Sequence, residues 1–198
     1  MGLIHIDLFT TLDLVAQAPG GPDEDPEEGF RFGGWQAPMM DEAVGGSVMS
    51  GLRDCDALLL GRKTYDIFAD YWPKQDDEIG RLFNSIPKYV ASRGEPELNW
   101  AGSSLATDVP EIRSRHRNVH VIGSLDFVQT LLRERLFDRL TLWVYPILLG
   151  HGKKVFDGGP VPSNLTLLEP PVAGKSGAVV LKYGLADGTP ATGDMTKP

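Results

Sequence analysis

Two segments of this chain share one pattern, in which a short, continuous apolar run ends at a glycine and leads directly into an amphipathic helix. The run at residues 56–60 meets Gly61, and the run at 119–122 meets Gly123. Continuous apolar runs of this length are typical of strands that are buried on both faces of a sheet. Such strands alternate with helices in parallel sheets, so the two segments predict an α/β fold.

The remaining patterns extend this alternation along the chain. Apolar and alternating stretches predict further strands at 3–9, 88–91 and 140–145, helices at about 38–53 and after Ser124, and a closing antiparallel hairpin at 164–170 and 177–185. We therefore expect one domain over residues 1–198. It should have a mostly parallel central sheet, an antiparallel C-terminal hairpin, and helices on both faces.

A long loop at about residues 17–38 interrupts this order. It combines glycines and prolines with the acidic run at 23–28 and carries Phe30, Phe32 and Trp35. Loops of this length in compact domains are often lids or ligand-contacting segments. Trp35 is therefore a candidate to stack on a flat substrate, and the alternative is that these aromatic side chains pack as a flap on the core.

Charge and composition exclude several classes of partner. The 198 residues carry 27 acidic and 19 basic side chains, a net charge of −8, and no basic stripe that would suit nucleic acid. No apolar run approaches the roughly 20 residues of a membrane span. The N-terminus lacks the basic region of a signal peptide, and the single cysteine, Cys55, cannot form an internal disulfide. These features predict a cytoplasmic protein with no nucleic-acid or membrane partner.

Several familiar motifs are missing from the sequence. There is no Gly-x-Gly-x-x-Gly fingerprint, the segment 152–154 lacks the remainder of a Walker A loop, and no Gly-x-Ser-x-Gly elbow occurs. The four histidines do not have the spacing of metal ligands. We therefore expect no metal, and His120 and Cys55 are expected to be packed side chains.

The ends of three predicted strands carry complementary residues. Gly61 and Gly123 stand where helices begin, and glycine at a helix N-terminus lets the backbone approach a phosphate. Arg62 and Thr64 add a guanidinium and a hydroxyl at the first of these turns. The strand at 88–91 ends beside another such pair, at 92–93. Two phosphate-type turns and a separate cationic corner suit a dinucleotide that carries an extra phosphate.

Three segments resemble the dihydrofolate reductase superfamily, specifically its RibD C-terminal branch, the reductase domain of riboflavin biosynthesis. They are Asp-Ala-Leu-Leu-Leu-Gly-Arg-Lys-Thr-Tyr at 56–65, Val-His-Val-Ile-Gly-Ser at 119–124, and the run at 136–156 that contains Pro-Ile-Leu-Leu-Gly-His-Gly-Lys. Their order and spacing match from residue 3 to about 185. The resemblance implies a sheet of about eight strands that binds NADPH across the strand ends.

The resemblance also assigns cofactor residues. The phosphate turn corresponds to Gly61, Arg62, Lys63 and Thr64, the corner for the adenosine 2′-phosphate to Ser92 and Arg93, and the pyrophosphate and nicotinamide side to Ile122, Gly123, Ser124, Leu125 and Asp126. The segment under the nicotinamide corresponds to residues 11–16, which include Ala16. Many relatives have glycine after the aspartate of that segment, and this chain has Leu14.

The resemblance implies an NADPH-dependent reductase that transfers hydride to a heterocyclic or sugar-imine substrate. The named candidate is 5-amino-6-(5-phosphoribosylamino)uracil, and the alternatives are dihydrofolate reduction and a non-catalytic nucleotide-binding protein. No catalytic residue is identified, and the nearest candidate acids are Asp41, which is also a candidate for substrate binding, and Glu42. Relatives commonly form homodimers, and Trp143 and Tyr145 share one strand face that needs covering, so a homodimer is expected.

Overall fold

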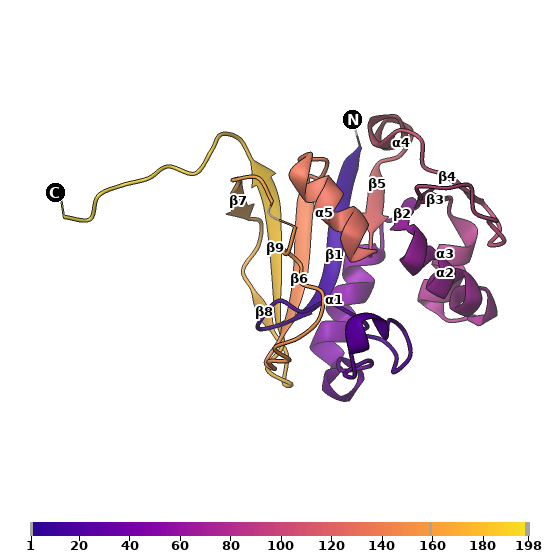
Figure 1. Ribbon diagram of the computed structural model, residues 1–198, viewed down its shortest axis with the longest axis horizontal. Coiled ribbons are helices and arrows are strands. Elements are labelled where there is room, and N and C mark those ends of the chain that lie inside the picture. Colours follow the sequence, from indigo (N-terminus) through magenta and orange to yellow (C-terminus); the bar gives the residue numbers. More distant parts are fainter. Residues whose placement is uncertain (1, 159, 197–198) are drawn as a thin grey trace.

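In the computed structural model, which describes residues 2–158 and 160–196, nine strands form one sheet in the order β4-β3-β2-β5-β1-β6-β9-β7, with β8 paired to β9 (Figure 1). The strands are β1 (Leu3–Thr11), β2 (Ala57–Gly61), β3 (Lys88–Ala91), β4 (Ser103–Leu105), β5 (Asn118–Val121), β6 (Arg139–Tyr145), β7 (Asn164–Leu167), β8 (Val172–Ala173) and β9 (Val179–Ala186). Every neighbouring pair from β4 to β6 is parallel. Strand β9 runs antiparallel to β6, β7 and β8, which confirms the predicted fold class.

Five α-helices cover this sheet. They are α1 (Glu42–Leu52), α2 (Arg62–Tyr71), α3 (Glu78–Ser85), α4 (Val109–Arg115) and α5 (Leu125–Arg133). An aspartate caps each of α1, α3 and α4, because the carboxylates of Asp41, Asp77 and Asp108 accept the backbone N–H three residues on. None of the helices in the described ranges is long and apolar enough to cross a lipid bilayer.

The alternation of β2 divides the core into two layers. Leu59 belongs to the cluster that contains Val128 and Leu131 of α5, whereas Leu58 and Leu60 pack with side chains of α1, α2 and α3. All five residues of β2 are buried, as its continuous apolar run predicts. Figure 1 shows α5 and α1 on opposite faces of the sheet. The helices therefore lie on both faces.

The loop at 17–38 covers the face of β6 that carries Trp143 and Tyr145. Trp35 is buried, its Nε1 donates to the carbonyl oxygen of Gln17 at 2.8 Å, and its ring meets Tyr145 edge-on at 5.5 Å. Trp143 and Tyr145 are buried in the same cluster as Val44 of α1. The chain thus covers this face itself, so the argument for a dimer from these two side chains does not hold. Of the two expectations for Trp35, the structure shows packing on the core.

Lys88, at the start of β3, is a lysine with no exposed surface. Its Nζ donates to the carbonyl oxygens of Phe83 and Asn84 near the C-terminus of α3, at 2.9 and 3.4 Å, and lies 4.4 Å from the centre of the Trp100 ring. Burial lowers the pKa of Lys88 to about 8, because the charged form loses its hydration. The helix C-terminus and the aromatic ring offset part of that loss.

This lysine should make stability depend on pH in the alkaline range. The folded pKa lies below the unfolded one, so the cost of burying the charge is fully present below about pH 8 and is relieved as pH rises toward the unfolded value. Relative to a Lys88→Met variant, the wild type should gain about 1 kcal/mol of unfolding free energy between pH 7.5 and pH 9. Urea denaturation of both proteins measures this difference. Parallel pH curves for the two proteins would contradict it.

Candidate functional site

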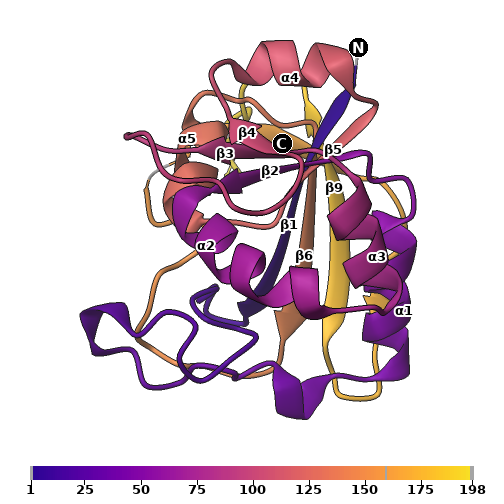
Figure 2. The same cartoon turned by 90° about the vertical axis from the view of Figure 1, so that its right-hand side faces the viewer.

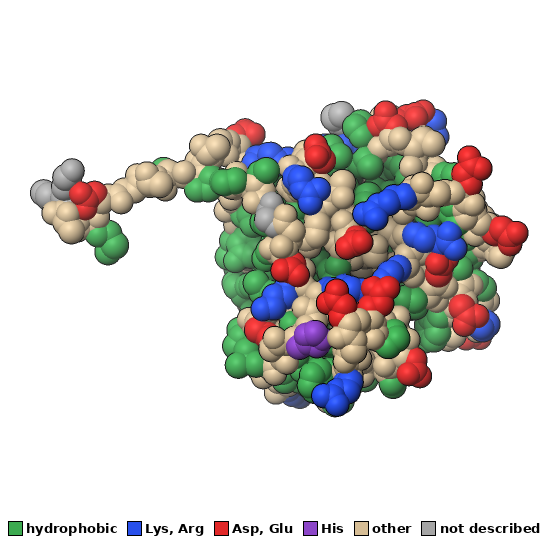
Figure 3. Space-filling model, viewed as in Figure 1, with side chains coloured by type: hydrophobic (Ala, Val, Ile, Leu, Met, Phe, Trp, Pro, Cys, Tyr) green, Lys and Arg blue, Asp and Glu red, His purple; other side chains and the backbone are tan. Residues whose placement is uncertain are grey.

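A cleft of about 1070 Å³ lies at the carboxyl ends of the parallel strands. It is lined by residues that follow β2, β3 and β5, by side chains of β1, and by the loop at 16–28, which Figure 2 shows in indigo beyond the end of β1. Acidic and basic side chains lie close together on this part of the molecule (Figure 3). Ligands of parallel α/β sheets bind at this edge, where helix N-termini point at the ligand.

The starts of α2 and α5 meet at this edge. The N–H of Gly61 donates to the carbonyl oxygen of Gly123 at 2.9 Å. A Cβ on Gly61 would lie 2.1 Å from Ser124 Oγ and 2.7 Å from Ser124 N, and a Cβ on Gly123 would lie 2.5 Å from Thr64 Oγ1. Both glycines are therefore required by close approach, and Gly123 also has a positive φ of 145°. The peptide between Gly123 and Ser124 is cis.

Neither helix start at this edge is capped by a side chain. Gly61 and Ser124 hold the N-cap positions of α2 and α5, and neither makes a side-chain capping bond, whereas aspartates cap the other three helices. The first N–H groups of a helix have no intrahelical partner and carry the positive end of its dipole. Two adjacent uncapped starts can therefore hold an anionic group such as a diphosphate.

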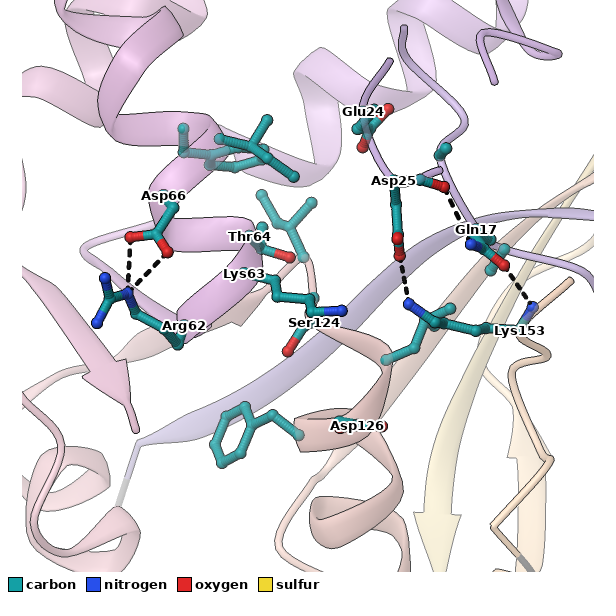
Figure 4. A pocket seen from close by; sticks show the side chains of 18 of the residues that line it. Gln17, Glu24, Asp25, Arg62, Lys63, Thr64, Asp66, Ser124, Asp126 and Lys153 are labelled. Carbon is teal, nitrogen blue, oxygen red and sulfur yellow. Dashed lines mark hydrogen bonds and ion pairs between the residues drawn. The ribbon is translucent and has the colours of Figure 1, made fainter. Parts of the chain in front are cut away.

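Three cations from α2 and the end of β3 border the cleft, and their pairing differs. Arg62 Nε donates to both carboxylate oxygens of Asp66 at 2.7 Å, one helical turn away (Figure 4). Lys63 forms an ion pair with Glu27 of the loop. Arg93 has no hydrogen-bond or ion-pair partner within the described ranges of the chain. A free guanidinium just after β3 is available to a phosphate.

Ion pairs fasten the acidic loop (residues 23–28) over one side of the cleft. Lys153 Nζ lies 2.5 Å from a carboxylate oxygen of Asp25 and 2.7 Å from one of Glu27, so Glu27 is shared between Lys153 and Lys63. These two lysines hold the pKa of Glu27 down at about 2. Gln17 adds hydrogen bonds from its Nε2 to the carbonyl oxygens of Asp25 and Glu27. The loop is thus bound to both walls of the cleft.

Most of the predicted cofactor residues line this cleft. They are Ala16, Arg62, Lys63, Thr64, Ser92, Arg93, Ile122, Gly123, Ser124, Leu125 and Asp126. Gly61 lies behind them as the N-cap of α2. Trp35, Asp41 and Glu42 do not line it, and the two acids border a separate, smaller hollow at the start of α1.

Asp41 has a structural role that explains its position. Its carboxylate accepts the N–H of Val44 at 2.9 Å and the N–H of Ser176 at 2.8 Å, so it caps α1 and holds the turn before β9. The hydrogen bond from Ser176, followed by that from Val44, lowers the pKa of Asp41 to about 2. Asp41 and Glu42, the candidate catalytic acids, therefore lie outside the cleft that holds the predicted cofactor residues, and the carboxylate of Asp41 caps a helix and holds a turn.

The loop after β1 supports the strand ends. Asp13 accepts hydrogen bonds from Thr11 Oγ1 at 2.5 Å and from the N–H of Gly150 at 2.8 Å, which joins this loop to the segment before Lys153. Leu14 has a positive φ of 67°, the conformation that glycine adopts at little cost. The chain therefore keeps the backbone shape that a glycine would favour, at some strain.

The polar residues of the cleft that were not among the sequence candidates include Asp7, Gln17, Asp25, Glu27 and Lys153. The sequence shows the acidic run at 23–28 and the two lysines at 153–154. It does not show that they pair, because the ion pairs join segments that are far apart along the chain. Asp7 could have been found from its place between Ile6 and Leu8 in a predicted strand. Because side chains alternate along a strand, its carboxylate lies on the face opposite to those two apolar side chains.

Within the described ranges, no group of three or more His, Cys, Asp or Glu side chains could hold a metal ion. Cys55 and His120 are both buried, as expected for packed side chains. Burial raises the pKa of the Cys55 thiol to about 12.

Comparison with known proteins gives a consistent group of relatives. Residues 3–175 match the RibD C-terminal domain. The uncharacterized protein YyaP of Bacillus subtilis (strain 168) is 26% identical over 167 residues, which cover 77% of this chain and 79% of that protein.

Solved structures share the fold at low identity. A putative riboflavin biosynthesis protein from Shewanella sp. PV-4 superposes with a TM-score of 0.67 at 17% identity, covering 93% of this chain and 99% of the other. A pyrimidine reductase-like protein from Corynebacterium diphtheriae gives 0.63 at 14%, covering 94% and 93%. RibD of Acinetobacter baumannii gives 0.63 at 13%, covering 94% of this chain and 59% of that protein. With the family match extending over most of its length, this chain belongs to the RibD C-terminal domain family.

Proposed function

We propose that the cleft binds NADPH and that the protein is a reductase of a small heterocyclic or imine substrate. One observation carries the proposal: α2 and α5 begin side by side, with Gly61 and Ser124 at their N-cap positions, and neither helix start is capped by a side chain. This pair of helix starts provides N–H groups and positive dipole ends for a diphosphate. Membership of the RibD C-terminal domain family supports the reductase activity.

The residues present fit each charged part of this cofactor. The N–H groups at the starts of α2 and α5, with the hydroxyls of Thr64 and Ser124, would hold the diphosphate. Ser92 and the unpaired Arg93 would hold the adenosine 2′-phosphate. When bound, NADPH supplies a hydride to a C=N or C=O bond. The chain's own residues would bind and orient the two reactants, and the acidic loop lies over one side of the cleft.

The substrate candidate remains 5-amino-6-(5-phosphoribosylamino)uracil. Its support is the family match and the likeness to a putative riboflavin biosynthesis protein, to RibD and to a pyrimidine reductase-like protein. Dihydrofolate reduction has less support, because Asp41 and Glu42, the acids considered for it, lie outside the cleft.

Saturating NADPH should raise the melting temperature. A ligand present at about 100 times its Kd that binds only the folded protein adds roughly 2.7 kcal/mol. Differential scanning fluorimetry with NADPH and NADH measures this shift, and oxidation of NADPH with the uracil substrate, followed at 340 nm, measures turnover. An unchanged melting temperature would exclude the cofactor. A shift without turnover on any heterocycle would favour the non-catalytic nucleotide-binding protein.

We also propose that the protein is a homodimer and that its interface lies on the outer strands. Leu165, Leu167, Leu168 and Val172, on and beside β7 and β8, are between 40% and 49% exposed. Apolar side chains gather over these strands at the left of Figure 3. A contiguous apolar surface of this kind favours association. Light scattering at micromolar concentration should give twice the mass of 21.6 kDa, and the mass of one chain would exclude the dimer.

A further inference from the structure

The loop at 17–38 gives the cleft a short stretch of backbone, residues 18–20, to which two residues with polar side chains are hydrogen-bonded. The backbone N–H of Gln36 donates to the carbonyl oxygen of Pro19 at 3.2 Å. The N–H of Gly20 donates to Oε2 of Glu24 at 2.6 Å, and the N–H of Gly21 donates to the same oxygen at 3.1 Å. Because Pro19 and Gly20 are consecutive, Gln36 and Glu24 stand at the same wall of the cleft. We call Gln36 and Glu24 the acceptor pair.

Gln36 presents a carboxamide oxygen to the cleft. The residue is 7% exposed, and its Nε2 donates to Tyr145 Oη at 2.9 Å and lies 3.1 Å from Met40 Sδ. Both amide hydrogens therefore have partners, which fixes the orientation of the carboxamide. Its Oε1 has no hydrogen-bond partner among residues 2–158 and 160–196 and is not enclosed by protein atoms. Because Gln36 lines the cleft, this oxygen is an acceptor that is open to a ligand.

Glu24 presents a second acceptor. Two backbone N–H groups use its Oε2, whereas its Oε1 has no partner in the described part of the chain. Figure 4 shows this side chain near Asp25, on the same loop. The lysines of the lining do not neutralise it, since Lys63 and Lys153 are paired with Asp25 and Glu27. The acceptor pair therefore has two oxygens for which the described residues supply no donor.

The acceptor pair lies away from the groups proposed for the cofactor phosphates. Gln36 contacts Tyr145 at the end of β6, whereas α5 begins after β5, α2 begins after β2, and Arg93 follows β3. Strand β1 separates β6 from β5 in the sheet, so the nearer helix start is two strand spacings, roughly 10 Å, from the end of β6. Phe9 of β1 and Phe68 of α2 add apolar surface to the cleft. This side of the cleft can therefore hold a second reactant beside the cofactor.

We propose that the acceptor pair is a subsite for a hydroxylated, sugar-type substituent of the substrate, whose hydroxyl groups donate to Gln36 Oε1 and Glu24 Oε1. This inference rests on the proposed function for the existence of a second reactant. A hydroxyl hydrogen rotates toward the acceptor beside it, so a furanose or an open polyol chain can satisfy two acceptors on different side chains. An apolar substituent displaces water from both acceptors and leaves them without a donor, which costs affinity. Gln36 and Glu24 are therefore specificity residues.

Uridine and 2′,3′-dideoxyuridine test this subsite, because they share the ring and the furanose and differ only in two vicinal hydroxyl groups. Ligand-observed NMR titration of the wild type should show uridine binding about tenfold more tightly than the dideoxy compound. Equal affinities for the two compounds overturn the inference, and so does a failure of uridine to bind at millimolar concentrations.

Variants of the acceptor pair locate this preference. Gln36→Met keeps the length of the side chain and removes the acceptor, so it should weaken uridine by about two- to tenfold and leave dideoxyuridine nearly unchanged. Glu24→Gln can accept the N–H of Gly20 through its single oxygen and then turns an NH₂ group toward the ligand, so uridine should lose about tenfold. Glu97→Gln, at an exposed position outside the lining, is the matched control for the loss of one charge.

A preference for uridine that is unchanged in both Gln36→Met and Glu24→Gln would overturn the assignment of the subsite to these residues. If either variant does not fold, the other variant and the comparison of the two ligands on the wild type still decide.

NADPH also carries ribose hydroxyls, so NADPH titration separates this inference from the proposed function. Uridine should bind to the NADPH complex as tightly as to the free protein, and both variants should keep the wild-type affinity for NADPH. Displacement of uridine by NADPH would assign the acceptor pair to a ribose of the cofactor and overturn the inference. Absence of NADPH binding in the wild type would remove the proposed function, while a preference for uridine that depends on Gln36 would still identify the subsite.

Discussion

Replacing Arg93 by alanine should weaken NADPH binding by about ten- to a hundred-fold and leave NADH binding nearly unchanged. The two cofactors differ by one phosphate on the adenosine ribose, so a protein separates them through a cation placed there. Arg93 follows β3, lines the cleft and has no partner among the described residues. Hydrogen bonds to charged groups contribute about 1.5–3 kcal/mol, which is one to two decades of affinity. Fluorescence titration with both cofactors measures the ratio.

Arg62→Ala is the matched comparison for this variant. Arg62 lies at the start of α2, where a diphosphate common to both cofactors would bind, and it is already held by Asp66. Its loss should change NADPH and NADH affinity by the same, smaller factor. Equal losses of NADPH and NADH affinity in Arg93→Ala would place the 2′-phosphate at another residue.

Gly61→Ala should lower the unfolding free energy by about 1–3 kcal/mol, and the melting temperature by several degrees. The added Cβ would meet the backbone N of Ser124 at 2.7 Å and Cβ of Phe127 at 3.0 Å, and neither atom can move without shifting α5. The end of β2 must then separate from the turn after β5. That separation would also pull apart the two uncapped helix starts, so NADPH affinity should fall with stability.

Gly46→Ala, in the same chain, should have the opposite sign. Gly46 lies inside α1, and a Cβ there would have nothing within 4 Å. Alanine in a helix interior is more favourable than glycine by about 0.5–1 kcal/mol. Thermal denaturation of both variants compares them under one condition. If Gly61→Ala were as stable as the wild type, the close approach of β2 to α5 would not be a constraint.

The parallel core was predictable because its strands are buried on both faces. The run at 57–61 is continuously apolar, so it predicts a strand that is buried on both faces. Its glycine marks the point where the strand ends and the helix begins. By contrast, α3, α4 and β4 escaped prediction. They are eight, seven and three residues long, and the aspartates that cap the two helices resemble ordinary loop acids until the tertiary contacts are formed.

The candidate site divides in the same way. The residues predicted for the cofactor come mainly from three strand ends that meet at one edge of the sheet, and 11 of the 12 line the cleft. Other parts of the cleft depend on contacts between distant segments, which the sequence did not indicate: Asp7 with His120, and Lys153 with Asp25. Trp35 shows the same limit, because an aromatic ring in a glycine-rich loop can face a ligand or the core, and here Tyr145 receives it. The NADPH and cytoplasmic assignments stay predictions.

The double ion pair of Glu27 has a consequence for the order in which reactants bind. Lys63, at the start of α2, is held by Glu27, so an anion that pairs with Lys63 competes with the loop for one cation. This competition is reciprocal. Closure of the loop lowers the affinity for such an anion by some factor, and binding of the anion shifts the equilibrium toward the open loop by the same factor. In the proposed function, a cofactor that pairs with Lys63 would therefore loosen the contact between the acidic loop and α2. We therefore expect the cofactor and the substrate of the proposed reaction to bind in a fixed order, which initial-rate patterns and product inhibition would reveal.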